Sequence, residues 1–262
     1  MFPAMHRQHI SFMRHIFPVV FAAFVCALHA QTLQVTPSRV LVDEPANIRA
    51  VGLEPNEHVV IQASLTDGAG QPWRSEAEFV ADPNGVVDLS AQSPLNGSYS
   101  ETSAMGLVWS MMPGAKHVNS YESPHELAPQ LISFNLVRKG KQVSTAQLDQ
   151  LMVAEDVHRI TVKGKLHGVL FLPEGNAPHP GVLVVGGSEG GAPMAKAAWL
   201  ASHGFAAFAL AYFRYEDLPP ELSGIPLEYF GEALGWMMQR PEIVPGPIAV
   251  VGTSRGGDSR CS

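Results

Sequence analysis

The sequence predicts two domains of different fold class, an N-terminal β-sandwich and a partial α/β domain with a mainly parallel sheet. Up to about residue 137, short β-rich segments alternate with turn-forming residues, and no helical period lies between them. From about residue 158, continuous apolar runs alternate with helical patterns. The boundaries that we expect are 1–30 for a leader, 31–140 for the sandwich, 141–157 for a linker and 158–262 for the α/β domain.

The composition excludes several classes of protein. The chain has 262 residues, of which 46% are hydrophobic, and its 24 glycines and 21 prolines indicate a globular protein rich in turns. The net charge of −7 and the lack of a basic run argue against binding to nucleic acid. Cys26 and Cys261 are the only cysteines, so the sequence supplies neither a disulfide framework nor a cysteine-based zinc site.

Residues 1–30 have the features of a secretory signal peptide. Arg7 and Arg14 precede the apolar run Ile16–Leu28, no Asp or Glu occurs, and Ala30 is the small residue at the expected cleavage point. The apolar run is shorter than the ~20 residues that a membrane-spanning helix needs. We therefore expect an exported protein, periplasmic or secreted, with no stable membrane span after processing.

The predicted sandwich consists of about seven short strands. Turn formers such as Asp82-Pro83-Asn84-Gly85 and Asn96-Gly97 separate them, as the reversals of an antiparallel sheet require. This spacing favours an immunoglobulin-like sandwich over a barrel. The expected strands are Leu33–Val35, Ala46–Val51, Val59–Leu65, Ala77–Val80, Val86–Leu89, Leu107–Trp109 and Ile132–Val137.

The region after the sandwich is predicted to alternate strands and helices. Thr145–Ala154 is interpreted as a short amphipathic helix or a linker, and Arg159–Val162 with Gly168–Leu172 as a hairpin. Strand, helix, strand, helix, strand then indicates crossover units and a mainly parallel sheet with flanking helices. The strands are Gly181–Val185, Phe205–Tyr212 and Ile248–Val251, and the helices are Pro193–His203 and Leu227–Met237.

A G-x-S-x-G motif follows the last of these strands. It reads Gly252-Thr253-Ser254-Arg255-Gly256, and in a nucleophile elbow its serine takes a strained turn conformation between strand and helix. The flanking glycines are needed because a Cβ there collides with neighbouring backbone. The preceding strands and helices therefore predict Ser254 as the nucleophile of an α/β-hydrolase, with Gly252 and Gly256 as elbow glycines.

A second G-x-S-x-G motif, Gly186-Gly187-Ser188-Glu189-Gly190, follows an earlier strand. An elbow serine is followed at once by a helix, whereas Ser188 is followed by a loop. This segment suits the oxyanion hole, which uses the N–H after the nucleophile, here that of Arg255, and an N–H from a glycine-rich loop. We expect the second donor from Gly187, Ser188 or Glu189; the alternatives are a phosphate-holding loop or a plain turn.

The acid and the base that such a serine needs are not identified by the sequence. Their expected order is Ser, then Asp or Glu, then His, but the residues after Ser254 include Asp258 and no histidine. With Ser188 as nucleophile the order also fails, because His203 precedes both Asp217 and Asp258. The polar ending predicts a chain cut short after the elbow.

The remaining polar residues are interpreted as structural. The histidines lack H-x-x-x-H or H-E-x-x-H spacing and are expected on the surface or in loops, and Glu216-Asp217 is interpreted as a solvated pair. No G-x-G-x-x-G or P-loop pattern occurs, so we expect no cofactor and no metal. These histidines are His58, His117, His125, His158, His167, His179 and His203.

Segments spread over nearly the whole chain after the leader carry a resemblance to one known family. They are Val35-Thr36-Pro37-Ser38, Val42-Asp43-Glu44-Pro45, Gly52-Leu53, Gly97-Ser98-Tyr99, Met105-Gly106-Leu107-Val108-Trp109-Ser110, Val185 to Gly191 and Gly252 to Gly257. With these segments, the chain resembles the acyl-CoA thioester hydrolase and bile acid-CoA:amino acid N-acyltransferase family. The resemblance implies a β-sandwich followed by an α/β-hydrolase domain, acting on acyl thioesters through a serine in thioesterases or a cysteine in amino-acid conjugating members. Ser254 at the position of that nucleophile favours hydrolysis.

The function expected from the sequence is a serine hydrolase of the acyl-CoA thioesterase type. It cleaves acyl-CoA to a fatty acid and CoA through an acyl-enzyme on Ser254, with activity impaired by the missing acid and base. Its expected partner is a small-molecule acyl thioester or ester, not nucleic acid. Two alternatives stay open: a non-catalytic exported binding protein or inactive fragment whose sandwich carries the function, and an N-acyltransferase or general esterase.

Overall fold

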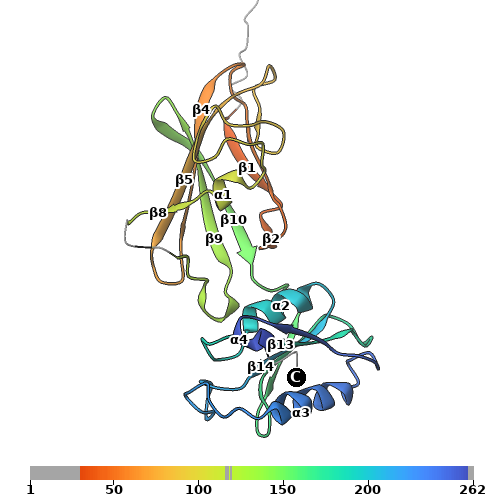
Figure 1. Ribbon diagram of the computed structural model, residues 1–262. Helices are drawn as coiled ribbons and strands as arrows, with labels where there is room; N and C mark the ends of the chain where they lie inside the picture. Colours follow the sequence, from red (N-terminus) through yellow and green to blue (C-terminus); the bar gives the residue numbers. More distant parts are fainter. Residues whose placement is uncertain (1–29, 116–117, 119, 259–262) are drawn as a thin grey trace, which may run out of the picture. The chain divides into compact units, whose positions relative to one another are not determined.

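The structure is a computed structural model that describes residues 30–115, 118 and 120–258. The predicted signal peptide therefore lies outside the described residues, apart from Ala30 at its end. No helix of the described part is both long and apolar enough to cross a bilayer. Two regions follow one another along the chain, a β-sandwich and a smaller mixed sheet with helices (Figure 1).

The first region is a sandwich of two sheets. The smaller sheet has the order β1-β3-β6, and the larger has the order β2-β10-β9-β4-β5-β7, with β8 also paired to β5. The strands are β1 (Thr32–Thr36), β2 (Arg39–Leu41), β3 (Asn47–Val51), β4 (His58–Thr66), β5 (Pro72–Val80), β6 (Val87–Asp88), β7 (Asn96–Gly97), β8 (Met112–Pro113), β9 (Gln130–Arg138) and β10 (Lys141–Leu151).

The core of the sandwich lies between the two sheets. Along β9, Ile132, Phe134 and Leu136 are fully buried, and the residues between them face outward. Ile48 of β3 and Ile61 of β4 belong to the same buried cluster, so both sheets contribute to one core. Because buried and outward-facing residues alternate, each strand has one apolar face. Two sheets pack together through these apolar faces.

Two sequence interpretations in this region are wrong. The expected strand Leu107–Trp109 lies in a short helix, α1 (Gly106–Trp109). Helical hydrogen bonds from Val108 and Trp109 to the carbonyl of Met105 replace strand pairing. A 3₁₀ turn, η1 (His125–Leu127), lies further along the chain.

The segment expected as a helix or linker, Thr145–Ala154, is mostly strand. β10 runs antiparallel to β9 from Lys141 to Gln150 and parallel to β2 at its end. The sequence pattern did not indicate a strand here, because the segment is mostly polar and Leu148 is its only apolar side chain that is fully buried. The sheet therefore extends past residue 140, into the segment that we assigned to a linker.

The second region is a five-stranded mixed sheet with the order β11-β12-β14-β13-β15. β13, β14 and β15 are parallel, whereas β11 pairs antiparallel with β12, as the predicted hairpin requires, and β12 pairs antiparallel with β14. The elements are β11 (His158–Val162), β12 (His167–Leu172), β13 (Gly181–Val185), α2 (Met194–Ser202), β14 (Ala206–Ala211), α3 (Leu227–Met238), β15 (Ala249–Gly252) and α4 (Arg255–Asp258).

Helices cover both faces of this sheet. Leu183 and Val185 of β13 pack in a cluster with Ala233 and Met237 of α3. The intervening Val182 and Val184 pack with α2. Figure 1 shows these two helices on opposite sides of β13 and β14. Because β13 and β14 are buried on both faces, these two strands are accessible only through the loops at their ends.

Candidate active site

The turn between β15 and α4 holds Ser254 in an unusual conformation. Its φ is +50°, in the left-handed region that non-glycine residues rarely occupy. The backbone N–H of Thr253 donates to the carbonyl of Val185 at 3.1 Å, and that of Gly256 donates to Thr253 at 2.9 Å. These bonds fix the turn to the end of β13, and the Ser254 side chain is left exposed.

Two glycines allow this turn to pack closely. A Cβ on Gly252 would lie 2.1 Å from the carbonyl oxygen of Gly256. A Cβ on Gly256 would lie 2.3 Å from the carbonyl oxygen of Gly186 and 2.8 Å from that of Val185. Both neighbours are backbone atoms, which cannot move aside as a flexible side chain can. A larger residue at Gly256 would therefore force the turn away from the end of β13, and one at Gly252 would force β15 away from the start of α4.

The glycine-rich loop after β13 lies against the same turn. A Cβ on Gly187 would be 3.2 Å from the Cβ of Ser254 and 3.1 Å from the carbonyl oxygen of Thr253. The structure thus brings Gly187 and Ser254 together, although 67 positions separate them in the sequence. Gly187 is buried, whereas Ser188 and Glu189 are exposed. Arg255, whose N–H is the other expected oxyanion donor, is the first residue of α4.

Sequence reasoning missed two side chains that hold these backbone segments. The Tyr212 hydroxyl donates to the carbonyl oxygens of Gly186 at 2.8 Å and of Gly187 at 3.3 Å. Burial raises the pKa of Tyr212, so the hydroxyl stays protonated as a donor. The ammonium group of Lys196 in α2 donates to the Thr253 hydroxyl at 2.6 Å. Neither residue belongs to a motif: Tyr212 directly follows β14, and Lys196 lies in the first turn of α2.

The described residues do not supply a base beside the serine. No described histidine is hydrogen-bonded to Ser254. His117 and residues 259–262 lie outside the described residues, and Asp258 is the last residue of α4. The acid and base therefore stay unassigned, as they are in the sequence.

One histidine expected on the surface or in a loop is buried. His167 is the first residue of β12, and only 8% of its side chain is exposed. Its Nδ1 atom and carboxylate oxygens of Glu216 and Asp217 all lie within 4.8 Å of one another, an arrangement that could hold a metal ion. Hydrogen bonding to Lys163 holds the pKa of the Glu216 carboxyl below its usual value. Sequence spacing could not reveal this group, because His167 is far from Glu216 and Asp217 in the chain.

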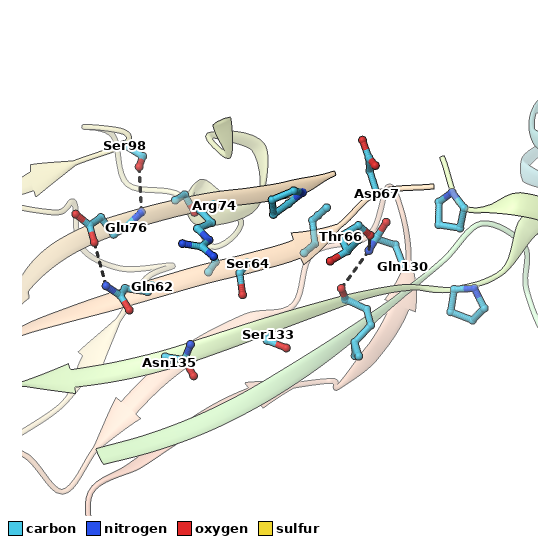
Figure 2. Close-up of a pocket in the computed structure, with 17 residues that line it drawn as sticks. Gln62, Ser64, Thr66, Asp67, Arg74, Glu76, Ser98, Gln130, Ser133 and Asn135 are labelled. Carbon is cyan, nitrogen blue, oxygen red and sulfur yellow. Dashed lines mark hydrogen bonds between the residues drawn. The ribbon is translucent and has the colours of Figure 1, made fainter. Parts of the chain in front are cut away.

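A separate groove lies on the sandwich. Its volume is about 890 Å³, and polar side chains of β4, β5 and β9 line its floor (Figure 2). Gln62 donates to Glu76 at 3.1 Å, and Gln130 donates to the carbonyl oxygen of Thr66 at the same distance. Arg74 supplies a positive charge beside them. The groove is formed by sandwich residues only, and Ser254 does not line it.

Comparison with known proteins connects both regions to one family. Residues 43–164 match the acyl-CoA thioester hydrolase/BAAT N-terminal region, a match that includes β10. Acyl-coenzyme A thioesterase 6 of Mus musculus is 36% identical over 235 residues, which are 87% of this chain and 56% of that protein. Bile acid-CoA:amino acid N-acyltransferase of Homo sapiens is 38% identical over 234 residues, 86% of this chain and 56% of that protein.

A third relative is the peroxisomal succinyl-coenzyme A thioesterase of Mus musculus, which is 34% identical over 235 residues, with 87% of this chain and 56% of that protein covered. The chain spans about half the length of these curated relatives. The aligned stretch is nevertheless longer than the 43–164 match, so the similarity extends beyond the N-terminal region of the family. These similarities relate the chain to acyl-CoA thioester hydrolases and bile acid-CoA:amino acid N-acyltransferases.

Proposed function

We propose that this chain is an acyl-thioester hydrolase with an α/β-hydrolase domain from about residue 158, in which Ser254 is the nucleophile. The observation that carries the proposal is the backbone of Ser254, held at a φ of +50° between Gly252 and Gly256 and against Gly187. Strain of this kind persists where the surroundings enforce it, and it is common at active sites. The relatives named as thioesterases point to the same chemistry.

The proposed reaction has two steps. The Ser254 hydroxyl oxygen attacks the carbonyl carbon of the thioester, the carbon–sulfur bond breaks, and the thiol leaves with the proton that the serine loses. Water then hydrolyses the acyl-serine ester to a carboxylic acid and restores the hydroxyl. Backbone N–H groups of Arg255 and of the Gly187–Glu189 loop would stabilise the oxyanion formed in each step.

The predicted leader bears on where the substrate is found, and the family resemblance bears on its carrier. With residues 1–30 as a signal peptide, we propose export, and the substrate is then an acyl thioester or ester outside the cytosol. The resemblance to the family makes CoA the first carrier to test. The negative net charge gives no electrostatic attraction to its phosphates.

A fluorophosphonate probe tests the nucleophile directly. The full chain should be labelled on Ser254, and Ser254→Ala should abolish the labelling. Ser188→Ala is the matched control, because Ser188 lies in the other G-x-S-x-G motif and should leave labelling unchanged. Labelling that survives in Ser254→Ala, or that is absent from the unmodified chain, would overturn the proposal.

Analysis of reaction products and of bound ligands distinguishes thioester hydrolysis from the two alternatives, an N-acyltransferase and a binding protein. Incubation with acyl-CoA and glycine or taurine would give an amide if the chain is an N-acyltransferase, and a free acid if it hydrolyses thioesters. The sandwich groove is the feature that favours a binding protein, because polar side chains and Arg74 line it. A chain with no probe labelling that binds a polar ligand, with affinity reduced by Arg74→Ala, would support that alternative.

A further inference from the structure

Three potential metal ligands meet at the end of the mixed sheet that also holds the Ser254 turn. His167 begins β12 and pairs with Ala211, the last residue of β14, and Glu216 and Asp217 follow in the next loop. Because β12 runs antiparallel to β14, its start lies at the carboxyl ends of the parallel strands. The backbone N–H of His167 also donates to the Tyr229 hydroxyl of α3, at 3.1 Å.

The Nδ1 atom of the His167 imidazole lies within ion-pair distance of two carboxylates, but at hydrogen-bond distance from neither. It is buried and has no hydrogen-bond partner. This atom lies 3.4 Å from Oδ1 of Asp217 and 3.6 Å from Oε2 of Glu216. Both distances exceed the 2.7–3.2 Å typical of a hydrogen bond. A buried polar atom without a partner is costly, and this one points at two carboxylates.

The charges around the cluster suit a dication. Lys163 lies 2.8 Å from Oε1 of Glu216, which leaves Oε2 directed to His167. The two carboxylates outnumber the one ammonium group, so the cluster has negative charge available to attract a cation.

We propose that His167, Glu216 and Asp217 bind a divalent transition-metal ion, with Zn²⁺ as the representative. One imidazole nitrogen and two carboxylate oxygens are ligands that this ion accepts at about 2.0–2.2 Å, and three protein ligands leave a position for water. Two ligand atoms at that distance lie at most about 4.4 Å apart. The cluster must close slightly, and Asp217, with 81% of its side chain exposed, has room to do so. The ion would tie the start of β12 to the loop after β14.

The test is a titration of the chelator-treated full chain with Zn²⁺ in competition with a chromophoric chelator. The unmodified chain should bind one equivalent more than His167→Gln, and Asp217→Asn should weaken that equivalent at least about tenfold. The chain contains 11 histidines, so the difference between variants, and not the total uptake, is decisive. The matched controls His158→Gln and Glu221→Gln remove exposed groups outside the cluster and should retain the equivalent.

Thermal melting provides a second readout. Zn²⁺ should raise the Tm of the unmodified chain and of Ser254→Ala by the same amount, which keeps this test independent of the proposed nucleophile. If His167→Gln fails to fold by circular dichroism, Asp217→Asn decides, because its side chain is exposed. Equal Zn²⁺ uptake by the unmodified chain and Asp217→Asn would overturn the proposal and leave the cluster as an ion pair.

Discussion

The sandwich and the mixed sheet bury their strands in different ways. In the sandwich, Ile61 of β4 and Phe134 of β9 are fully buried, while Gln62 and Asn135 beside them face outward and line the polar groove (Figure 2). In the mixed sheet every residue of β13 and β14 is buried, because helices cover both faces. A sheet with one free face can bind along that face, whereas a sheet covered on both faces offers only its ends.

This difference explains where the candidate sites lie. The groove lies on the outer face of the large sandwich sheet. Ser254, the Gly187 loop and the His167 cluster all lie in segments at the carboxyl end of the parallel strands β13, β14 and β15. The proposed chemistry in the mixed sheet therefore depends on close packing at the strand ends. We expect the sandwich to tolerate substitutions on its surface better than the mixed sheet tolerates substitutions at its strand ends.

Gly256→Ala should have the largest effect. The new Cβ would overlap the carbonyl oxygens of Gly186 and Val185, so we expect a loss of stability on the order of 5 kcal/mol and no labelling of Ser254 by the fluorophosphonate probe. Gly235→Ala in α3 is the control, since nothing lies within 4 Å of its added Cβ. It should stabilise the chain by up to about 1 kcal/mol. Equal melting temperatures for the two variants would refute the close-packing argument.

Phe134→Ala should affect the sandwich alone. Removing this fully buried ring leaves a cavity and should cost about 3–5 kcal/mol in the free energy of unfolding. Hydrogen exchange by mass spectrometry should show faster exchange in β4 and β9 and unchanged protection in β13. Faster exchange in β13 as well would mean that the two regions unfold together, contrary to the two-domain boundaries that we propose.

Tyr212→Phe should have a smaller effect on stability. It removes the hydroxyl that donates to Gly186 and Gly187, which should cost about 1 kcal/mol and slow probe labelling of Ser254. Tyr229→Phe is the matched control, because its hydroxyl donates to the carbonyl of Ala211 at 2.8 Å, away from the glycine loop. Tyr229→Phe should lose about as much stability as Tyr212→Phe, but probe labelling of Ser254 should be unchanged. If both variants label at the same rate, Tyr212 does not position the loop.

Glu78→Gln in the sandwich should have the smallest effect, because its partner His58 is exposed. Hydrogen bonds from His58 and Asn96 hold the pKa of Glu78 below its ordinary value of 4.5. The carboxylate therefore stabilises the fold above about pH 4.5, and this contribution is lost as the pH falls through the lowered value. The Tm of Glu78→Gln should be slightly below that of the unmodified chain at pH 7, and the difference should shrink as the pH falls below 4.5. A difference that does not shrink would contradict this assignment.

Strong local patterns were sufficient to predict most elements. The helices expected within Pro193–His203 and Leu227–Met237 occur as α2 and α3, because their apolar residues recur at helical spacing. The run Gly181–Val185 is a strand with the predicted bounds. Two weak patterns gave wrong predictions. The three residues Leu107–Trp109 are too few to distinguish a strand from a helix. The strand β10 is mostly polar, so it has little of the apolar alternation that marks a strand.

The sequence alone determined the class of each region and the candidate serine, because periodicity and glycine spacing are local properties. Only the tertiary structure decided which distant segments meet: β10 beside β9, Gly187 against Ser254, and His167 facing Glu216 and Asp217. Such contacts depend on sheet order and on strand direction. For example, β12 pairs antiparallel with β14, and this direction brings residue 167 to the end of the sheet where residues 216 and 217 lie. No residue pattern within either segment specifies that pairing.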